Sequence, residues 1–144
     1  MLKVEDMSPA EMHSLLQRES FGHLGCARDG RPYVVPMHYA YDGKEFYFFT
    51  TTGMKTRYID ANPVVCLQVE EVTDRTRWRS VVVIGRATEI TNDEESQRAM
   101  KFITERNPSL TPAISATQVD SIGRAVDIAL YRIVPELIDG RKTV

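Results

Sequence analysis

Two Asp-Gly pairs, Asp29-Gly30 and Asp42-Gly43, divide the first third of the chain into short β-rich runs. Glycine tolerates the positive φ that two-residue hairpin turns need, so each pair predicts a tight turn between antiparallel strands. The flanking runs are rich in aromatic and β-branched residues and span Phe21–Ala27, Tyr33–Tyr41 and Glu45–Thr51. This spacing favours a fold built on an antiparallel sheet.

The β-rich pattern continues after the hairpins. Val64–Val72 and Trp78–Ile90 are two further expected strands, and Ala125–Ile138 alternates as a last strand with a kink at Pro135. Pro36, inside the second run, cannot donate to a strand ladder, so it marks an edge, a bulge or a neighbour that is not a strand. We expect six strands, the first four as consecutive neighbours, in a small antiparallel barrel.

Helices are expected at three places between the strands. Residues Ser8–Glu11 form a capping box with proline at the first helical position, and that helix should end near Glu19. A short helix is expected over Met54–Ala61 and another over Asp93–Arg106, each bounded by Asn-Pro or Asn signals. The stretch Ser109–Arg124 is predicted as helix and loop.

Length and charge restrict the class of protein. The 144 residues fit one domain, residues 1–144, and a net charge of -2 gives no basic field that would attract nucleic acid. The sequence begins without an apolar leader and holds no run of the ~20 apolar residues that a membrane helix needs. Cys26 and Cys66 lie in apolar runs without a CxxC partner, so we expect buried free thiols and a cytoplasmic location.

The fifth expected strand carries apolar residues on both of its faces. A small barrel can cover only one of them, and Trp78–Ile84 would leave the other exposed. Exposed apolar surface of this kind marks interfaces. We therefore expect a homodimer.

The segment Thr50–Arg57 is the most informative for ligand binding. A strand ends in hydroxyl residues, Gly53 lets the backbone turn, and a helix begins with Lys55 and Arg57 in its first turn. Helix N-terminal amides, hydroxyls and a lysine suit a phosphate, and basic residues at this end oppose the helix dipole unless an anion offsets them. A solvated turn with a surface lysine is the other interpretation.

Other polar residues give weaker signals. Arg75, Arg77 and Arg79 alternate and could share one face, either as a basic stripe for an anionic ligand or as a solvated sheet edge. The three histidines have no metal-ligand spacing, and His38 is either a ligand contact or a structural residue. With no nucleophile or acid–base pair evident, a cofactor would have to carry any chemistry.

The order of several motifs resembles the pyridoxamine 5'-phosphate oxidase-like FMN-binding split-barrel family, most closely its nitroimidazole-reductase-like branch. The likeness covers about Met7 to Ile90 and implies a mainly β fold with flanking helices, a six-stranded antiparallel split β-barrel. The motifs are Gly22–Cys26, Asp29–Met37, Phe46–Thr50, Gly53–Lys55, Asn62–Val65 and Ser80–Ala87.

The resemblance also implies a site for flavin mononucleotide (FMN) between two copies of the chain. By this likeness, the flavin ring is lined by backbone groups of Val34, Val35, Pro36 and Met37. The ring and the ribityl chain are supported by Phe49, Thr50 and Thr51, and the phosphate is held by Lys55. The partner subunit adds Trp78, Arg79 and Ser80.

The implied activity is an FMN-dependent oxidoreductase that reduces a small nitroaromatic or quinone acceptor with NAD(P)H. Pyridoxamine phosphate oxidases carry arginines where this chain has Val34 or Val35 and Met54, and Tyr131–Val144 lacks their substrate-binding motifs, which argues against vitamin B6 phosphates as substrates. A non-catalytic flavin carrier or sensor is the alternative, as is a split barrel that uses deazaflavin or haem.

Overall fold

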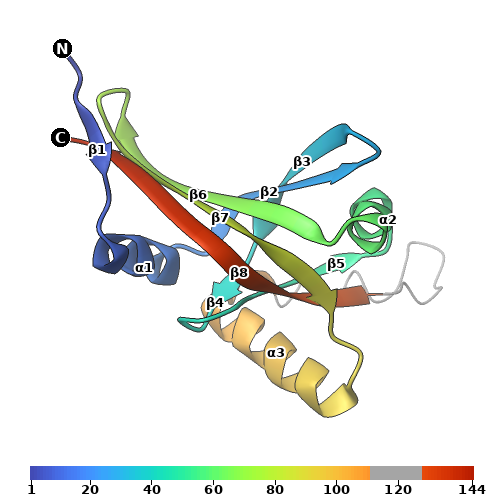
Figure 1. The fold of residues 1–144 in the computed structure, drawn as a ribbon. Coiled ribbons are helices and arrows are strands. Elements are labelled where there is room, and N and C mark those ends of the chain that lie inside the picture. Colours follow the sequence, from blue (N-terminus) through green and yellow to red (C-terminus); the bar gives the residue numbers. More distant parts are fainter. Residues whose placement is uncertain (111–127) are drawn as a thin grey trace.

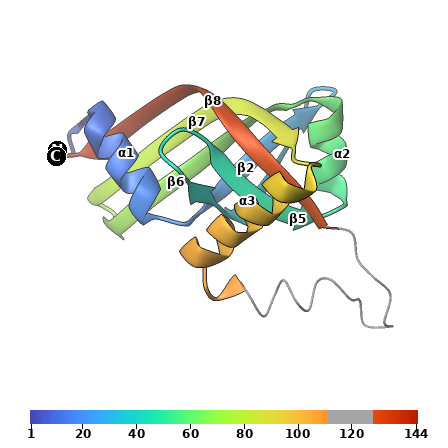
Figure 2. The same cartoon turned by 90° about the horizontal axis from the view of Figure 1, so that it is seen from below.

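The predicted hairpin at Asp29-Gly30 is present. Strand β2 (Phe21–Arg28) pairs antiparallel with β3 (Arg31–His38), and both turn residues have positive φ, 51° for Asp29 and 75° for Gly30. The structure, a computed structural model, describes residues 1–110 and 128–144. It shows a curled antiparallel sheet with helices at both ends and along one side (Figure 1 and Figure 2), which confirms the predicted mainly β class.

The strand order differs from the expected one. Among the described residues the sheet has eight strands, not six, in the order β3-β2-β6-β7-β8-β5-β4, with β1 paired to β8. The third and fourth predicted strands, β5 and β6, are not neighbours, because β7 and β8 lie between them. The remaining strands are β1 (Val4–Asp6), β4 (Ala40–Tyr41), β5 (Phe46–Thr51), β6 (Val64–Asp74), β7 (Arg77–Glu89) and β8 (Ile128–Thr143).

Local capping signals place the helices. Helix α1 (Pro9–Arg18) has its capping box, with the Ser8 amide donating to Glu11 Oε1 at 3.0 Å. Helices α2 (Met54–Ala61) and α3 (Asp93–Arg106) have the predicted bounds. Most of the predicted segment Ser109–Arg124 lies outside the described residues.

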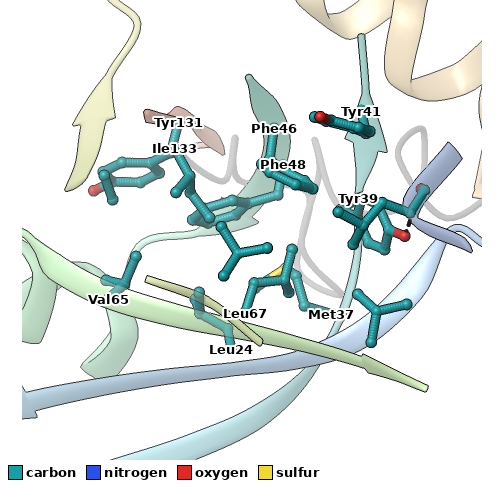
Figure 3. Close-up of a cluster of buried hydrophobic side chains, with 14 of the residues drawn as sticks. Leu24, Met37, Tyr39, Tyr41, Phe46, Phe48, Val65, Leu67, Tyr131 and Ile133 are labelled. Carbon is teal, nitrogen blue, oxygen red and sulfur yellow. Dashed lines mark hydrogen bonds between the residues drawn. The ribbon is translucent and has the colours of Figure 1, made fainter. Parts of the chain in front are cut away.

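The hydrophobic core fills the inside of the curled sheet (Figure 3). The ring of Phe48 stacks on that of Tyr131 across the β5–β8 pair, with centroids 5.3 Å apart. Leu24 and Leu67 lie opposite each other on the paired strands β2 and β6, and both side chains are fully buried. Aromatic residues from one side of the barrel and aliphatic residues from the other therefore hold the sheet in its curved shape.

A single residue, Tyr39, joins the two edges of the sheet. Strand β3 is one edge and β4 the other, and only Tyr39 separates them in the chain. The Tyr39 amide donates to Ser20 O at 2.9 Å, its hydroxyl donates to Leu16 O at 2.8 Å, and its carbonyl accepts from Asn107 Nδ2 at 3.0 Å. The barrel is thus pinned at Tyr39 and stays open beyond it.

The two strand prolines lie at irregular or edge positions. Pro36 is on the edge strand β3, one of the places predicted for it. Beside Pro135 the β7–β8 register shifts, since Ile84 lies opposite Leu137 while Gly85 lies opposite Pro135. The predicted kink is a bulge that leaves Glu136 unpaired.

Candidate functional site

On either side of Tyr39, the outer edges of β3 and of most of β5 have no strand partner among the described residues. We call the opening between these two edges the split. Among the described residues, β3 pairs only with β2. Strand β5 pairs with β8 along its length, while β4 covers only Phe46 and Tyr47 on its other side. The backbone groups that point into the split from β3 and from Phe48–Thr51 are therefore free of ladder partners and can serve a ligand.

The β3 edge carries four of the predicted site residues, and their side chains alternate. Val34 and Pro36 point outward, and Val34 is 64% exposed. Val35 and Met37 point into the barrel, where they pack with the core. The side chains of these four residues supply apolar surface only, so any polar contact that they make with a ligand would come from their backbone groups.

The β5 edge carries the next three. Phe49 packs its side chain against the α3 cluster, which contains Ile103, so only its backbone is available to a ligand. Thr50 is buried and its hydroxyl donates to Thr51 O at 3.2 Å. Thr51 is exposed at the strand end, directly before the loop to α2.

Lys55 lies at the end of the split where α2 packs against β2. It is half-buried and has no ion pair with a carboxylate in the described ranges. Burial raises the pKa of the Cys26 thiol, the neighbouring Cys66 raises it further, and the positive charge of Lys55 acts in the opposite direction. The half-buried Lys55 is thus on a helix that packs against β2, and its charge acts on the Cys26 thiol.

The first turn of α2 is open to an anion. Gly53 N donates to Thr56 Oγ1 at 2.9 Å, and that hydroxyl donates back to Gly53 O at 2.9 Å, so the loop is held closed. No side chain caps the free amides of the helix. Uncapped amides, the Thr51 hydroxyl and the Lys55 ammonium form a donor set that fits a phosphate group.

An apolar hollow of about 330 Å³ lies on the outer face of the sheet near α2. Gly25, Val34, Val64, Cys66 and Ile84 are part of its lining. The sequence predicted buried thiols; Cys26 is buried, but Cys66 is only half-buried and faces this hollow. Sequence reasoning missed the hollow, because the strand register that brings these residues together is a long-range property.

Trp78, Arg79 and Ser80 lie at the far end of β7. Arg86 on the same strand pairs with Val64, which follows α2, and Trp78 is eight residues away, about 26 Å at the usual strand rise. Within one chain these residues cannot reach the Lys55 end of the split. Their side chains alternate, so Trp78 and Ser80 share the outer face with Val82 and Ile84.

Two other predicted polar residues, Arg77 and His38, differ in whether they have a partner in the structure. Arg77 pairs with Asp74 at 2.7 Å in the β6–β7 turn, which lowers the Asp74 pKa. His38 Nδ1 is buried and has no hydrogen-bond partner in the described part of the chain. Residues 1–110 and 128–144 contain no cluster of three metal-ligating side chains, and none of their helices has the length and apolar character to cross a bilayer.

Comparison with known proteins gives matches along the whole chain. The family model described as pyridoxamine 5'-phosphate oxidase matches residues 8–142. An uncharacterized protein from Rhizobium meliloti is 38% identical over 87 residues, which are 60% of this chain and 58% of that protein. The chain thus matches less than two thirds of the length of that relative.

Solved structures share the fold. An FAD-binding protein from Mesorhizobium loti superposes with a TM-score of 0.79 at 29% identity, covering 100% of this chain and 99% of that one. A protein named for a suspected role in 5-nitroimidazole antibiotic resistance, from Bacteroides thetaiotaomicron, also gives 0.79, at 18% identity over 99% and 89% of the two chains. The second match bears on the fold alone. With the family model matching nearly all of its length, the chain belongs to the pyridoxamine 5'-phosphate oxidase family.

Proposed function

We propose that the protein is a flavoprotein that binds FMN in the split and passes electrons from NAD(P)H to a small nitroaromatic or quinone-type acceptor. The observation that carries this proposal is the split itself, two unpaired strand edges that end at an uncapped helix with Lys55 in its first turn. The likeness to the FAD-binding protein from Mesorhizobium loti supports a flavin as the ligand.

The chain's own residues would bind and orient the cofactor. Backbone groups of Val34–Met37 would hydrogen-bond the polar edge of the ring, and the ends of β5 would support the ribityl chain. Lys55 and the α2 amides would hold the phosphate. The bound flavin would supply the electron transfer, because the hollow beside the split offers thiols but no carboxylate or imidazole.

A second copy of the chain would complete the site. A row of outward residues crosses five paired strands: Val34, Gly25, Cys66, Ile84 and Leu137. Leu137 is 56% exposed, and Val34 and Ile84 are also exposed. A continuous apolar row of this size is typical of an interface, and a two-fold dimer buries the same row on both copies.

The position of Val82 supports this arrangement. Val82 is exposed and lies midway between Trp78 and Arg86, four residues from each. A two-fold axis passing near Val82 would bring Trp78, Arg79 and Ser80 of one copy to the α2 end of the other. Residues that one chain holds about 26 Å apart would then meet at one flavin.

The absorption spectrum of the purified protein tests the cofactor. Bands near those of oxidised flavin, and retention of FMN after gel filtration, are expected; a colourless protein that takes up no added FMN would refute the proposal. A spectrum typical of deazaflavin or haem would show that the protein binds that cofactor instead of FMN. Anaerobic mixing with NADPH should bleach the flavin, whereas the flavin of a carrier or sensor would stay oxidised.

The two free thiols fit a reducing cytoplasm, where we propose that the protein works.

A further inference from the structure

We propose that the ligand site continues past Lys55 into a cavity between the β2–β3 turn and α2, and that this cavity binds the second phosphate of an adenine dinucleotide. The inference rests on the proposed flavin site. FMN has one phosphate and needs no such extension. FAD carries an adenosine phosphate joined to the FMN phosphate, and NADPH carries adenosine phosphates of its own. The cavity has the chemistry for such a group.

The cavity is about 390 Å³ and is lined by Arg28, Asp29, Arg31 and Tyr58. Arg28 and Arg31 lie directly opposite each other as the last pair before the hairpin turn. The turn residues Asp29 and Gly30 both adopt positive φ, which fixes the turn and so the distance between the two arginine backbones. Two guanidinium groups thus lie on one side of the cavity on a rigid support.

The arginines carry more positive charge than their surroundings offset. Arg28 Nε is 3.7 Å from Asp29 Oδ2, too long for a hydrogen bond, and Asp29 is 88% exposed. Arg31 has no ion pair with a carboxylate in the described part of the chain. Asp60 on α2 forms no ion pair with either arginine in the described residues. A phosphate with two or more acceptor oxygens would suit the paired guanidinium forks.

One face of α2 connects this cavity to the phosphate site. Tyr58 is three residues after Lys55, so the two side chains lie on the same face, about 4.5 Å apart along the axis. The Tyr58 ring lies against Tyr33, with centroids 5.6 Å apart, and Tyr33 is paired with Cys26 on β2, the strand against which α2 packs. In FAD the second phosphate is joined to the first by a bridging oxygen and needs an adjoining site of this kind, and the same site would take an adenosine phosphate of NADPH bound beside FMN.

The dinucleotide has two possible sources, and binding measurements distinguish them. FMN and FAD are titrated into apoprotein, followed by quenching of flavin fluorescence, and NADP⁺ is titrated calorimetrically into FMN-loaded protein. Arg31→Gln is compared with Arg31→Lys, which keeps the charge but loses the fork, and with the control Arg98→Gln on α3, where an exposed arginine pairs with Glu94. Thermal melting shows that each variant is folded.

If FAD is the ligand, apoprotein binds FAD at least tenfold more tightly than FMN, and Arg31→Gln removes that preference while FMN affinity is unchanged. If the source is NADPH, both flavins bind equally and Arg31→Gln weakens NADP⁺ about tenfold. Arg31→Lys should fall between, and Arg98→Gln should match the parent. If Arg31→Gln alters none of these affinities while FMN still binds, the inference is wrong and the flavin site stands. If no flavin binds, both proposals are wrong.

Discussion

The sulfur of Cys66 fills the space beside Gly25 that any larger residue there would need. A Cβ placed on Gly25 would lie 2.7 Å from Cys66 Sγ, shorter than atoms of this size allow. The two residues are direct partners in the β2–β6 ladder, on the outer face of the sheet. The glycine therefore keeps the outward-facing thiol close to the sheet.

Gly25→Ala should lower the free energy of unfolding by about 1–3 kcal/mol, because the added methyl group forces Cys66 or the strand to move. Cys66→Ala should remove most of that penalty when the two changes are combined. Urea unfolding of both single variants and the double variant gives the coupling energy. Additive effects would show that the contact with Cys66 is not the cause.

Lys55→Ala should weaken FMN binding by about 1.5–3 kcal/mol, the usual contribution of a hydrogen bond to a charged group, with the fold intact. Lys101→Ala is the matched control, since that lysine is 79% exposed on α3. Fluorescence titration of apoprotein measures both affinities. Equal affinities in the two variants would place the phosphate elsewhere.

Ile84→Glu should separate the proposed dimer, because it puts a carboxylate into the apolar row on the outer face. FMN retention should fall with it, since Trp78, Arg79 and Ser80 would no longer reach the split. Gln97→Glu adds the same group to the exposed side of α3 and should leave the mass unchanged. Light scattering after gel filtration reports the mass; a parent protein that is already monomeric would contradict the dimer.

Stability should depend on pH through Glu11. Hydrogen bonds from Lys142 and the Ser8 amide lower the pKa of Glu11 from 4.5 to about 2. The folded-state pKa is below the unfolded one, so the stabilisation is complete above about pH 4.5 and is lost as the pH falls towards 2. Urea midpoints measured across this range should fall less steeply for Glu11→Gln. Parallel curves would show that other groups cause the acid sensitivity.

Asn107→Ala should destabilise the protein by about 1–3 kcal/mol, because it leaves the buried Tyr39 carbonyl without its donor. Asn92→Ala removes the N-cap of α3 and should destabilise only that helix. Hydrogen exchange distinguishes them, since only the Asn107 change should speed exchange at the Tyr39 amide. Unchanged exchange there would mean that Tyr39 is held by its other two bonds.

Features set by neighbouring residues were predictable from the sequence. The bounds of α2 and α3 follow from Asn and Pro signals within a few residues of their ends, and the Asp29-Gly30 turn follows from its two residues. The family resemblance and the mainly β class are also confirmed. The edge position of Pro36 is one of the three places that its missing amide predicted.

Features that depend on pairing between distant segments of the chain were not predictable from the sequence. The order of the strands depends on where β8 inserts, and nothing near β5 or β6 in the sequence indicates that β7 and β8 separate them. Strands β1 and β4 have three and two residues, too few to give a periodic pattern. The half-exposed position of Cys66 and the cavity at Arg31 likewise depend on register between segments far apart in the chain.

The place of β8 in the sheet has a consequence for biosynthesis. This strand comes after every other described element, yet it lies between β7 and β5 and also pairs with β1. While the ribosome is still making residues 128–143, the nascent chain presents two open edges, and its apolar interior is uncovered on one side. The interior can be fully buried only after β8 has left the exit tunnel of the ribosome.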